Sequence, residues 1–213
     1  MVKNTVIFDI DGVIINSEFI YRERRETFFK LNGVNITENF QNTLVGSNPE
    51  AMMENLFPND EKKQSDMLTK YIRFIKTYYI NYKKIINPDI YHVIDRLKNQ
   101  YGMRIAIASA GTLQQIIYIL QELSLYDSVD YFISGEEVAK TKPAPDIYLE
   151  LLNRMDCLAN DCIVVEDSEY GIKSAKTAGI DCLALQQSDA LNINQTEADE
   201  IILSLNDIFD WLN

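Results

Sequence analysis

Hydrophobic positions follow two different periods along this chain. Residues 5–8 form a short apolar run with β-branched and aromatic side chains, which is typical of a buried strand. Between residues 16 and 84 the apolar positions instead recur at helical spacing, and no convincing strand interrupts them. This stretch predicts helices over residues 18–31, from 49 to the break at 58–60, and over 61–84.

From residue 87 onward, short apolar runs alternate with helical patterns. Such alternation predicts an α/β fold, in which a parallel sheet is covered by helices on both faces. Helices are expected at 88–100, 112–123, 146–155 and 171–178, and strands at 104–108, 131–133, 162–165, 182–185 and near 201–203.

The order of these elements predicts two domains. The first strand precedes the helical block, and every other strand follows it. We therefore expect residues 1–15 and 85–213 to form an α/β core, with residues 16–84 inserted as an all-helical cap. Opening and closing of this cap would admit a substrate and exclude water.

Composition limits the possible partners. With 213 residues the chain can form one core and a smaller insertion, and 46% hydrophobic residues are ordinary for a globular protein. The formal net charge of −12 argues against a nucleic-acid partner, which needs clustered basic residues. An anionic small substrate stays possible, because a bound divalent metal can reverse the local charge.

Cysteine and histidine are scarce. The three cysteines form no C-x-x-C pair, and a single histidine cannot complete a Cys/His zinc site with them. Catalysis by serine or cysteine with histidine would depend on His92 alone, without a nucleophile-elbow pattern. We expect reduced thiols, no signal peptide and no membrane span, and hence a cytoplasmic protein. A monomer is a separate expectation, since the sequence says little about oligomeric state.

Two acids follow the first strand. Asp9 and Asp11 are two residues apart, so on extended backbone their side chains start toward the same side, and Gly12 then allows a sharp turn. Buried together, the two carboxylates repel unless a cation or a shared proton compensates. A solvated strand end is the simpler alternative. A calcium loop fits poorly, because its sixth and twelfth positions would hold Ile14 and Ile20.

Other chemistry-bearing residues also follow predicted strands. In an open parallel sheet such residues meet at the carboxyl edge. Ser109 follows the second strand, Lys142 lies beyond the third, and Glu166 and Asp167 follow the fourth. Each also has an explanation without a functional role. Ser109 could cap a helix, Lys142 could be a solvated loop charge, and Glu166 with Asp167 could form an exposed turn.

Taken together, these residues predict phosphoryl-transfer chemistry. Mg²⁺ prefers oxygen ligands and commonly binds carboxylates and substrate phosphate together. A carboxylate beside a metal and a lysine can attack phosphorus and form an aspartyl-phosphate. Lys142 and Ser109 would stabilise the transferring group, and Asp11 would protonate the leaving group and later activate water.

The chain resembles the haloacid dehalogenase-like hydrolase superfamily. The resemblance is carried by D-I-D-G-V at 9–13, I-A-S-A at 107–110, K-P-A-P-D-I-Y at 142–148 and V-E-D-S-E-Y-G-I at 165–172. It implies a Rossmann-like core with a helical cap inserted after the first strand. It also implies that Asp9 is the nucleophile, that Asp11 is the acid/base, and that Ser109 and Lys142 bind the phosphoryl group.

The same resemblance implies a Mg²⁺ site. Asp9, Asp167 and the backbone carbonyl of Asp11 would be its ligands, and Glu166 would act indirectly or through water. Substrate contacts are expected from the site and from the cap, at Gly12, Ala110, Glu18, Tyr21, Arg22, Gly46, Ser47, Asn48 and Lys76.

Within the superfamily the chain looks most like the β-phosphoglucomutase and sugar-phosphatase branch. It departs from the mutase pattern at three places: residues 46–49 contain no arginine, Tyr21 replaces a histidine, and Thr112 replaces a lysine. We therefore expect a Mg²⁺-dependent phosphatase acting on a small phosphorylated metabolite, with a sugar phosphate as the candidate substrate. A mutase is the alternative, because Arg22 or Arg25 could hold a second phosphate. A catalytically silent binding protein is a third hypothesis.

Overall fold

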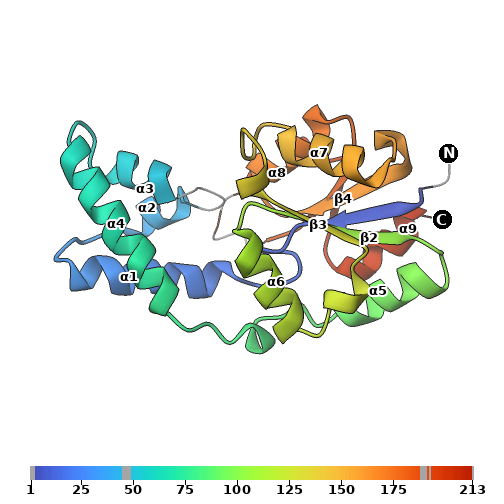
Figure 1. Cartoon of the computed structure of the whole chain (residues 1–213), viewed down its shortest axis with the longest axis horizontal. Coiled ribbons are helices and arrows are strands. Elements are labelled where there is room, and N and C mark those ends of the chain that lie inside the picture. The colour runs from blue at the N-terminus through green and yellow to red at the C-terminus, as the bar shows by residue number, and fades with distance from the viewer. Residues whose placement is uncertain (1–2, 45–48, 188–190, 192, 213) are drawn as a thin grey trace. The chain divides into compact units, whose positions relative to one another are not determined.

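A parallel sheet is the centre of the larger part of the molecule (Figure 1). The computed structural model describes residues 3–44, 49–187, 191 and 193–212. Within these residues the strand order is β3-β2-β1-β4-β5-β6, and all neighbouring strands are parallel. The strands are β1 (Thr5–Phe8), β2 (Arg104–Ser109), β3 (Tyr131–Ser134), β4 (Cys162–Glu166), β5 (Asp181–Leu185) and β6 (Glu200–Ile202).

Strand register brings the ends of β1, β2 and β4 together. Phe8, the last residue of β1, is paired with Ile107 of β2 and with Val165 of β4. Val6, Ile7 and Phe8 are fully buried, as expected for a central strand covered on both faces. From β1, the chain continues to β2 and β3 on one side of the sheet and then to β4, β5 and β6 on the other side. In open parallel sheets, ligands bind at the carboxyl ends of the strands where the strand order changes direction in this way.

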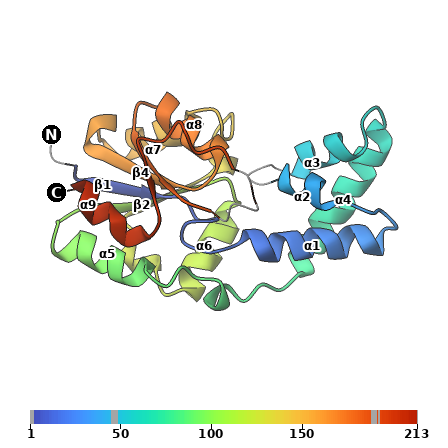
Figure 2. The same cartoon turned by 180° about the vertical axis from the view of Figure 1, so that it is seen from behind.

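Helices cover both faces of the sheet, as predicted. In both views α7 and α8 lie on one face, and α5 and α6 lie on the other (Figures 1 and 2). The Arg96 guanidinium of α5 lies 3.9 Å from the ring centroid of Phe209, so α9 packs beside α5. These helices are α5 (Ile90–Asn99), α6 (Leu113–Glu122), α7 (Asp146–Met155), α8 (Glu169–Thr177) and α9 (Ile208–Leu212), and the 3₁₀ turns are η1 (Tyr82–Lys84), η2 (Tyr126–Ser128), η3 (Gly135–Glu137), η4 (Ala159–Asp161) and η6 (Leu205–Asp207).

The chain divides into two compact units. The sheet unit comprises Met1–Asn16 and Tyr82–Asn213, and the helical unit comprises Ser17–Asn81. The helical unit contains α1 (Glu18–Leu31), α2 (Glu38–Asn42), α3 (Pro49–Leu56) and α4 (Glu61–Thr77). Its core is aromatic and methionine-rich, with the ring centroid of Phe28 lying 5.1 Å from that of Phe29 and 5.0 Å from that of Tyr71.

Three details of the element prediction need correction. The helix predicted over 61–84 is wrong beyond Thr77, because Tyr78 is extended and residues 82–84 form a separate 3₁₀ turn. The short helices α2 and α9 were not predicted, since five residues carry too little periodic pattern. Elsewhere element ends differ from the prediction by one or two residues, as for α5 and β4.

Cys157, Cys162 and Cys182 are free thiols, as expected. In the described part of the chain, no helix has the length and apolar character needed to cross a membrane.

Candidate active site

Three acids meet at the carboxyl edge of the sheet. Asp9 directly follows β1, and its backbone N–H donates to the carbonyl of Val165 in β4 at 3.0 Å. Asp9 is 7% exposed, Glu166 is fully buried and Asp167 is 8% exposed. One carboxylate oxygen from each of the three lies within 4.8 Å of the others. This acidic cluster, defined as Asp9, Glu166 and Asp167, is the centre of the candidate site.

Lys142 neutralises part of this charge. Its ammonium nitrogen Nζ lies 2.6 Å from Oδ1 of Asp9, 2.6 Å from Oε1 of Glu166 and 3.0 Å from the carbonyl oxygen of Ala108. A lysine ammonium has three N–H donors, and each has an acceptor here. Lys142 therefore connects the ends of β1, β2 and β4 through one buried cation.

Glu166 is held by a dense set of hydrogen bonds. Its Oε1 also accepts from the Tyr148 hydroxyl at 3.3 Å, and its Oε2 accepts from the backbone N–H groups of Asp167 and Ser168 and from the Ser168 hydroxyl. A Cβ at Gly171 would lie 1.8 Å from Oε1, so only glycine leaves room for this carboxylate. These contacts favour an indirect role for Glu166, in which it positions Lys142 and the loop that carries Asp167.

The turn after β1 also depends on glycine. Gly12 has a φ of +78°, and a Cβ there would lie 1.9 Å from Oδ2 of Asp167. The turn therefore lies directly against the Asp167 carboxylate. Asp11, which is partly exposed, contributes negative charge to both Asp9 and Asp167.

Ser109 and Ala110 lie where β2 ends. Ser109 is 2% exposed, and its hydroxyl oxygen accepts from the Gly111 N–H at 3.1 Å. The cap of α6 is Thr112, whose side chain accepts from the Gln115 N–H, so the helix-cap explanation for Ser109 is wrong. Ser109 instead shapes the turn beside the carbonyl that binds Lys142. Ala110 is exposed on the same turn.

The acidic cluster has more negative charge than the single positive charge of Lys142 can neutralise. Burial, with the charges of Glu166 and Asp11 added, raises the pKa of Asp9 to about 8 even though Lys142 opposes the shift. Burial and the neighbouring acids likewise raise the pKa of Asp167 well above its usual value. Burial alone would lower the pKa of Lys142, but Asp9 and Glu166 outweigh it and raise that pKa. One lysine does not compensate for this much negative charge.

A divalent cation fits this donor set. Each member of the acidic cluster offers a carboxylate oxygen, and oxygen ligands are those that Mg²⁺ prefers. A bound cation would also stabilise the ionised forms that burial disfavours.

In the helical unit, the predicted substrate residues make contacts of their own. Glu18 forms an ion pair with Arg25, which is 7% exposed and also donates to Oε1 of Gln41 at 2.7 Å. The Arg24 guanidinium stacks on the Tyr21 ring at 4.3 Å. Lys76 is exposed near the end of α4. Gly46, Ser47 and Asn48 lie outside the described residues.

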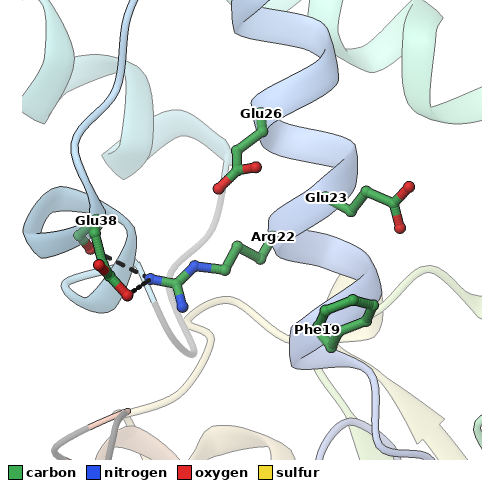
Figure 3. A pocket seen from close by; sticks show the side chains of 5 residues that line it. All are labelled: Phe19, Arg22, Glu23, Glu26 and Glu38. Carbon is green, nitrogen blue, oxygen red and sulfur yellow. Dashed lines mark hydrogen bonds and ion pairs between the residues drawn. The ribbon is translucent and has the colours of Figure 1, made fainter.

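A hollow of about 370 Å³ lies on the helical unit (Figure 3). At this hollow, the Arg22 guanidinium lies 3.4 Å from the carbonyl oxygen of Glu38 and 3.9 Å from its carboxylate. The lining contains three carboxylates and one guanidinium, so its charge disfavours a second phosphate group. The lining residues are Phe19, Arg22, Glu23, Glu26 and Glu38.

A family-level sequence profile described as haloacid dehalogenase-like hydrolase matches residues 6–185. The chain belongs to this family. The match includes each residue of the acidic cluster and Lys142, and it confirms the resemblance inferred from the sequence motifs.

Two curated relatives represent two activities of the haloacid dehalogenase-like hydrolases. The chain is 28% identical over 177 residues to a phosphorylated carbohydrates phosphatase of Thermotoga maritima, covering 83% of this chain and 82% of that protein. It is 27% identical over 200 residues to the β-phosphoglucomutase of Bacillus subtilis, covering 87% of this chain and 84% of that protein.

A solved structure supports the fold. The β-phosphoglucomutase of Clostridium difficile superimposes with a TM-score of 0.78 at 20% identity, covering 100% of this chain and 96% of that chain.

Sequence reasoning missed two residues of this haloacid dehalogenase-like site. Tyr148 and Gly171 both lie inside motif stretches, but their spacing gave no sign that each contacts the Glu166 carboxylate. Both contacts depend on how α7 and α8 pack against the end of β4, which local pattern does not encode.

Proposed function

We propose that this haloacid dehalogenase-like protein is a Mg²⁺-dependent phosphatase that hydrolyses a small phosphorylated metabolite. The observation that carries the proposal is the position of the Asp9 carboxylate next to both the Lys142 ammonium and the other acids of the cluster. A buried carboxylate beside a fixed cation and candidate metal ligands is equipped to attack phosphorus. Similarity to a phosphorylated carbohydrates phosphatase supports the same class of substrate, with a sugar phosphate the first candidate.

The proposed reaction has two steps. In the first, an Asp9 oxygen forms a bond to phosphorus while the bond from phosphorus to the leaving-group oxygen breaks, and Asp11 gives that oxygen a proton. In the second, Asp11 takes a proton from water, the water oxygen bonds to phosphorus, and the bond to Asp9 breaks to release phosphate. Lys142 and Ser109 stabilise the charge on the phosphoryl oxygens in both steps.

Metal binding is assigned to the same edge of the sheet. Asp9, Asp167 and the backbone carbonyl of Asp11 are the proposed Mg²⁺ ligands, and Glu166 supports them by holding Lys142. When bound, the ion supplies Lewis-acid stabilisation of the phosphoryl oxygens.

The helical unit is proposed as the specificity cap. Glu18, Tyr21, Arg22 and Lys76 remain its candidate substrate contacts, together with residues 46–48. Because the sheet unit offers groups suited to a phosphoryl group, recognition of the rest of the metabolite is assigned to this cap.

A phosphosugar mutase is the second candidate, favoured by similarity to the Bacillus subtilis β-phosphoglucomutase. Two observations weigh against it. Arg25 is occupied by Glu18 and Gln41, and the surroundings of Arg22 are acidic. A mutase needs a second anion site to hold a bisphosphate, so these contacts favour hydrolysis.

The proposal is tested by phosphate release from a panel of phosphorylated metabolites, with Mg²⁺ and with a chelator. We expect release from at least one sugar phosphate that requires Mg²⁺ and is abolished by Asp9→Asn. Asp127→Asn, at an exposed position in η2, is the matched control and should keep full activity. A coupled assay for glucose 6-phosphate formed from β-glucose 1-phosphate distinguishes the mutase. Release that persists in Asp9→Asn would overturn the proposed nucleophile.

A further inference from the structure

Two glutamines that follow β5 make hydrogen bonds to the loops of the candidate site. Nε2 of Gln195 donates to the carbonyl oxygen of Asp167 at 2.6 Å and to that of Leu185 at 2.9 Å. Nε2 of Gln187 donates to the carbonyl oxygen of Gly12 at 2.8 Å and lies 3.5 Å from that of Leu185. Gln195 is 7% exposed, and Gln187 is half-buried.

The orientation of both amides follows from their partners. Backbone carbonyl oxygens only accept hydrogen bonds, so each glutamine must present its NH₂ group and not its oxygen. Since the carbonyl of Leu185 receives both amides, one chain of hydrogen bonds runs from Gly12 through Gln187, Leu185 and Gln195 to Asp167. We call this chain the amide bridge.

The amide bridge joins two loops that already touch. A Cβ at Gly12 would lie 1.9 Å from Oδ2 of Asp167, so the turn after β1 and the Asp167 carboxylate are in contact. A shift of either loop would therefore change where the Asp167 carboxylate lies relative to Asp9. Neither glutamine belongs to the acidic cluster, so any effect of theirs is exerted through the backbone.

We infer that Gln187 and Gln195 are positioning residues for the metal site, because the amide bridge fixes the loop of Gly12 against the loop of Asp167. This inference rests on the proposed function, in that the ion is the Mg²⁺ proposed above. Groups that orient metal ligands typically change metal affinity by about 10- to 100-fold when they are removed. The amide bridge should therefore set Mg²⁺ affinity as well as activity.

Calorimetric titration of the metal-free protein with Mg²⁺ tests the inference without using turnover. Gln195→Met and Gln187→Met keep side-chain length but remove the donors. Each is expected to raise the Mg²⁺ dissociation constant by about tenfold or more. Gln186→Met, at an exposed neighbouring position, is the matched control and should bind Mg²⁺ like the wild-type protein. Circular dichroism of each metal-free variant checks that it is folded.

The outcomes separate this inference from the function on which it rests. Wild-type affinity, within about twofold, in folded Gln195→Met and Gln187→Met would overturn the amide bridge and leave the metal site standing. If Gln195→Met does not fold, the half-buried Gln187→Met decides alone. Absence of Mg²⁺ binding by the wild-type protein would overturn the proposed metal site, and the inference with it.

Discussion

The Nζ of Lys142 lies 2.6 Å from Oδ1 of Asp9, although 133 residues separate them in the sequence. The parallel order β3-β2-β1-β4 accounts for this pair, because Asp9 follows β1 and Lys142 lies on the loop that follows β3, at the same edge of the sheet. Negative charge exceeds positive charge around this pair. Lys142 contacts the carboxylates of Asp9 and Glu166 directly, and Asp167 and Asp11 add further negative charge.

Removing the Lys142 charge should slow catalysis strongly. Lys142→Met is expected to lower phosphate release by about 100-fold or more, because a charge-stabilising donor is lost from a buried site. Lys140→Met, at an exposed position on the same loop, should retain activity. Steady-state kinetics with p-nitrophenyl phosphate measure both variants, and equal rates for the two would contradict the role given to Lys142.

A methyl group at Gly171 should displace the Glu166 carboxylate. Because the added Cβ would lie 1.8 Å from Oε1 of Glu166, Gly171→Ala is expected to reduce both stability and activity. A stability loss of about 1–3 kcal/mol is typical of such overpacking. Gly102→Ala, whose Cβ would meet nothing within 4 Å, adds only backbone strain at a φ of +65° and should keep its activity. Urea unfolding and kinetics compare the two, and full activity in Gly171→Ala would show that Glu166 does not position Lys142.

Arg25 should behave as a structural residue of the helical unit. Arg25 and its hydrogen bond to Gln41 are buried, and its ion pair with Glu18 is partly buried, so Arg25→Met is expected to destabilise the protein by about 3 kcal/mol. Arg22→Met, at a partly exposed position, should change the free energy of unfolding much less. Chemical denaturation measures both. A raised KM with unchanged stability in Arg25→Met would instead support the second anion site of a mutase.

When Mg²⁺ is removed by a chelator, the free energy of unfolding should depend on pH. The pKa of Asp9 rises from an ordinary value of 3.8 to about 8 in the folded chain. Between those values the folded chain keeps a proton that the unfolded chain releases, so the free energy of unfolding should decrease as pH rises. The raised pKa of Asp167 acts in the same direction. Because Mg²⁺ binds the deprotonated acids, added Mg²⁺ should oppose this loss.

Thermal unfolding between about pH 5 and pH 8, with a chelator or with Mg²⁺, measures the effect. Asp9→Asn is the matched control, since it removes one titrating group of the acidic cluster and should weaken the pH dependence. Stability of the chelated wild-type protein that increases with pH in this range would contradict the raised pKa values.

The sequence predicted the sheet and the identity of the clustered acids for a physical reason. Short apolar strands with helices between them leave few alternatives to a parallel sheet, and such a sheet brings Asp9, Lys142 and Asp167 to one edge. The end of α4 was not predictable in the same way, because Tyr78 and Tyr79 continue an amphipathic pattern although the backbone at Tyr78 is extended.

Contacts between distant segments were also beyond the sequence. Nothing in the pattern around Gln195 shows that its amide lies 2.6 Å from the carbonyl of Asp167, 28 residues away. Likewise the hydrogen bond from Arg25 to Gln41 depends on how α1 packs against α2. Together with the Glu18 ion pair within α1, this hydrogen bond decides whether Arg25 is free to bind an anion. Such contacts follow from tertiary packing and not from local periodicity.

The most direct measurement of the central claim is the identification of the residue that becomes phosphorylated during turnover. The protein is mixed with p-nitrophenyl phosphate and Mg²⁺, quenched, treated with borohydride to reduce any aspartyl-phosphate, and digested for mass spectrometry. The account predicts a reduced residue at Asp9, which disappears in Asp9→Asn and when Mg²⁺ is chelated. Turnover without modification at Asp9, or with modification at another residue, would contradict it.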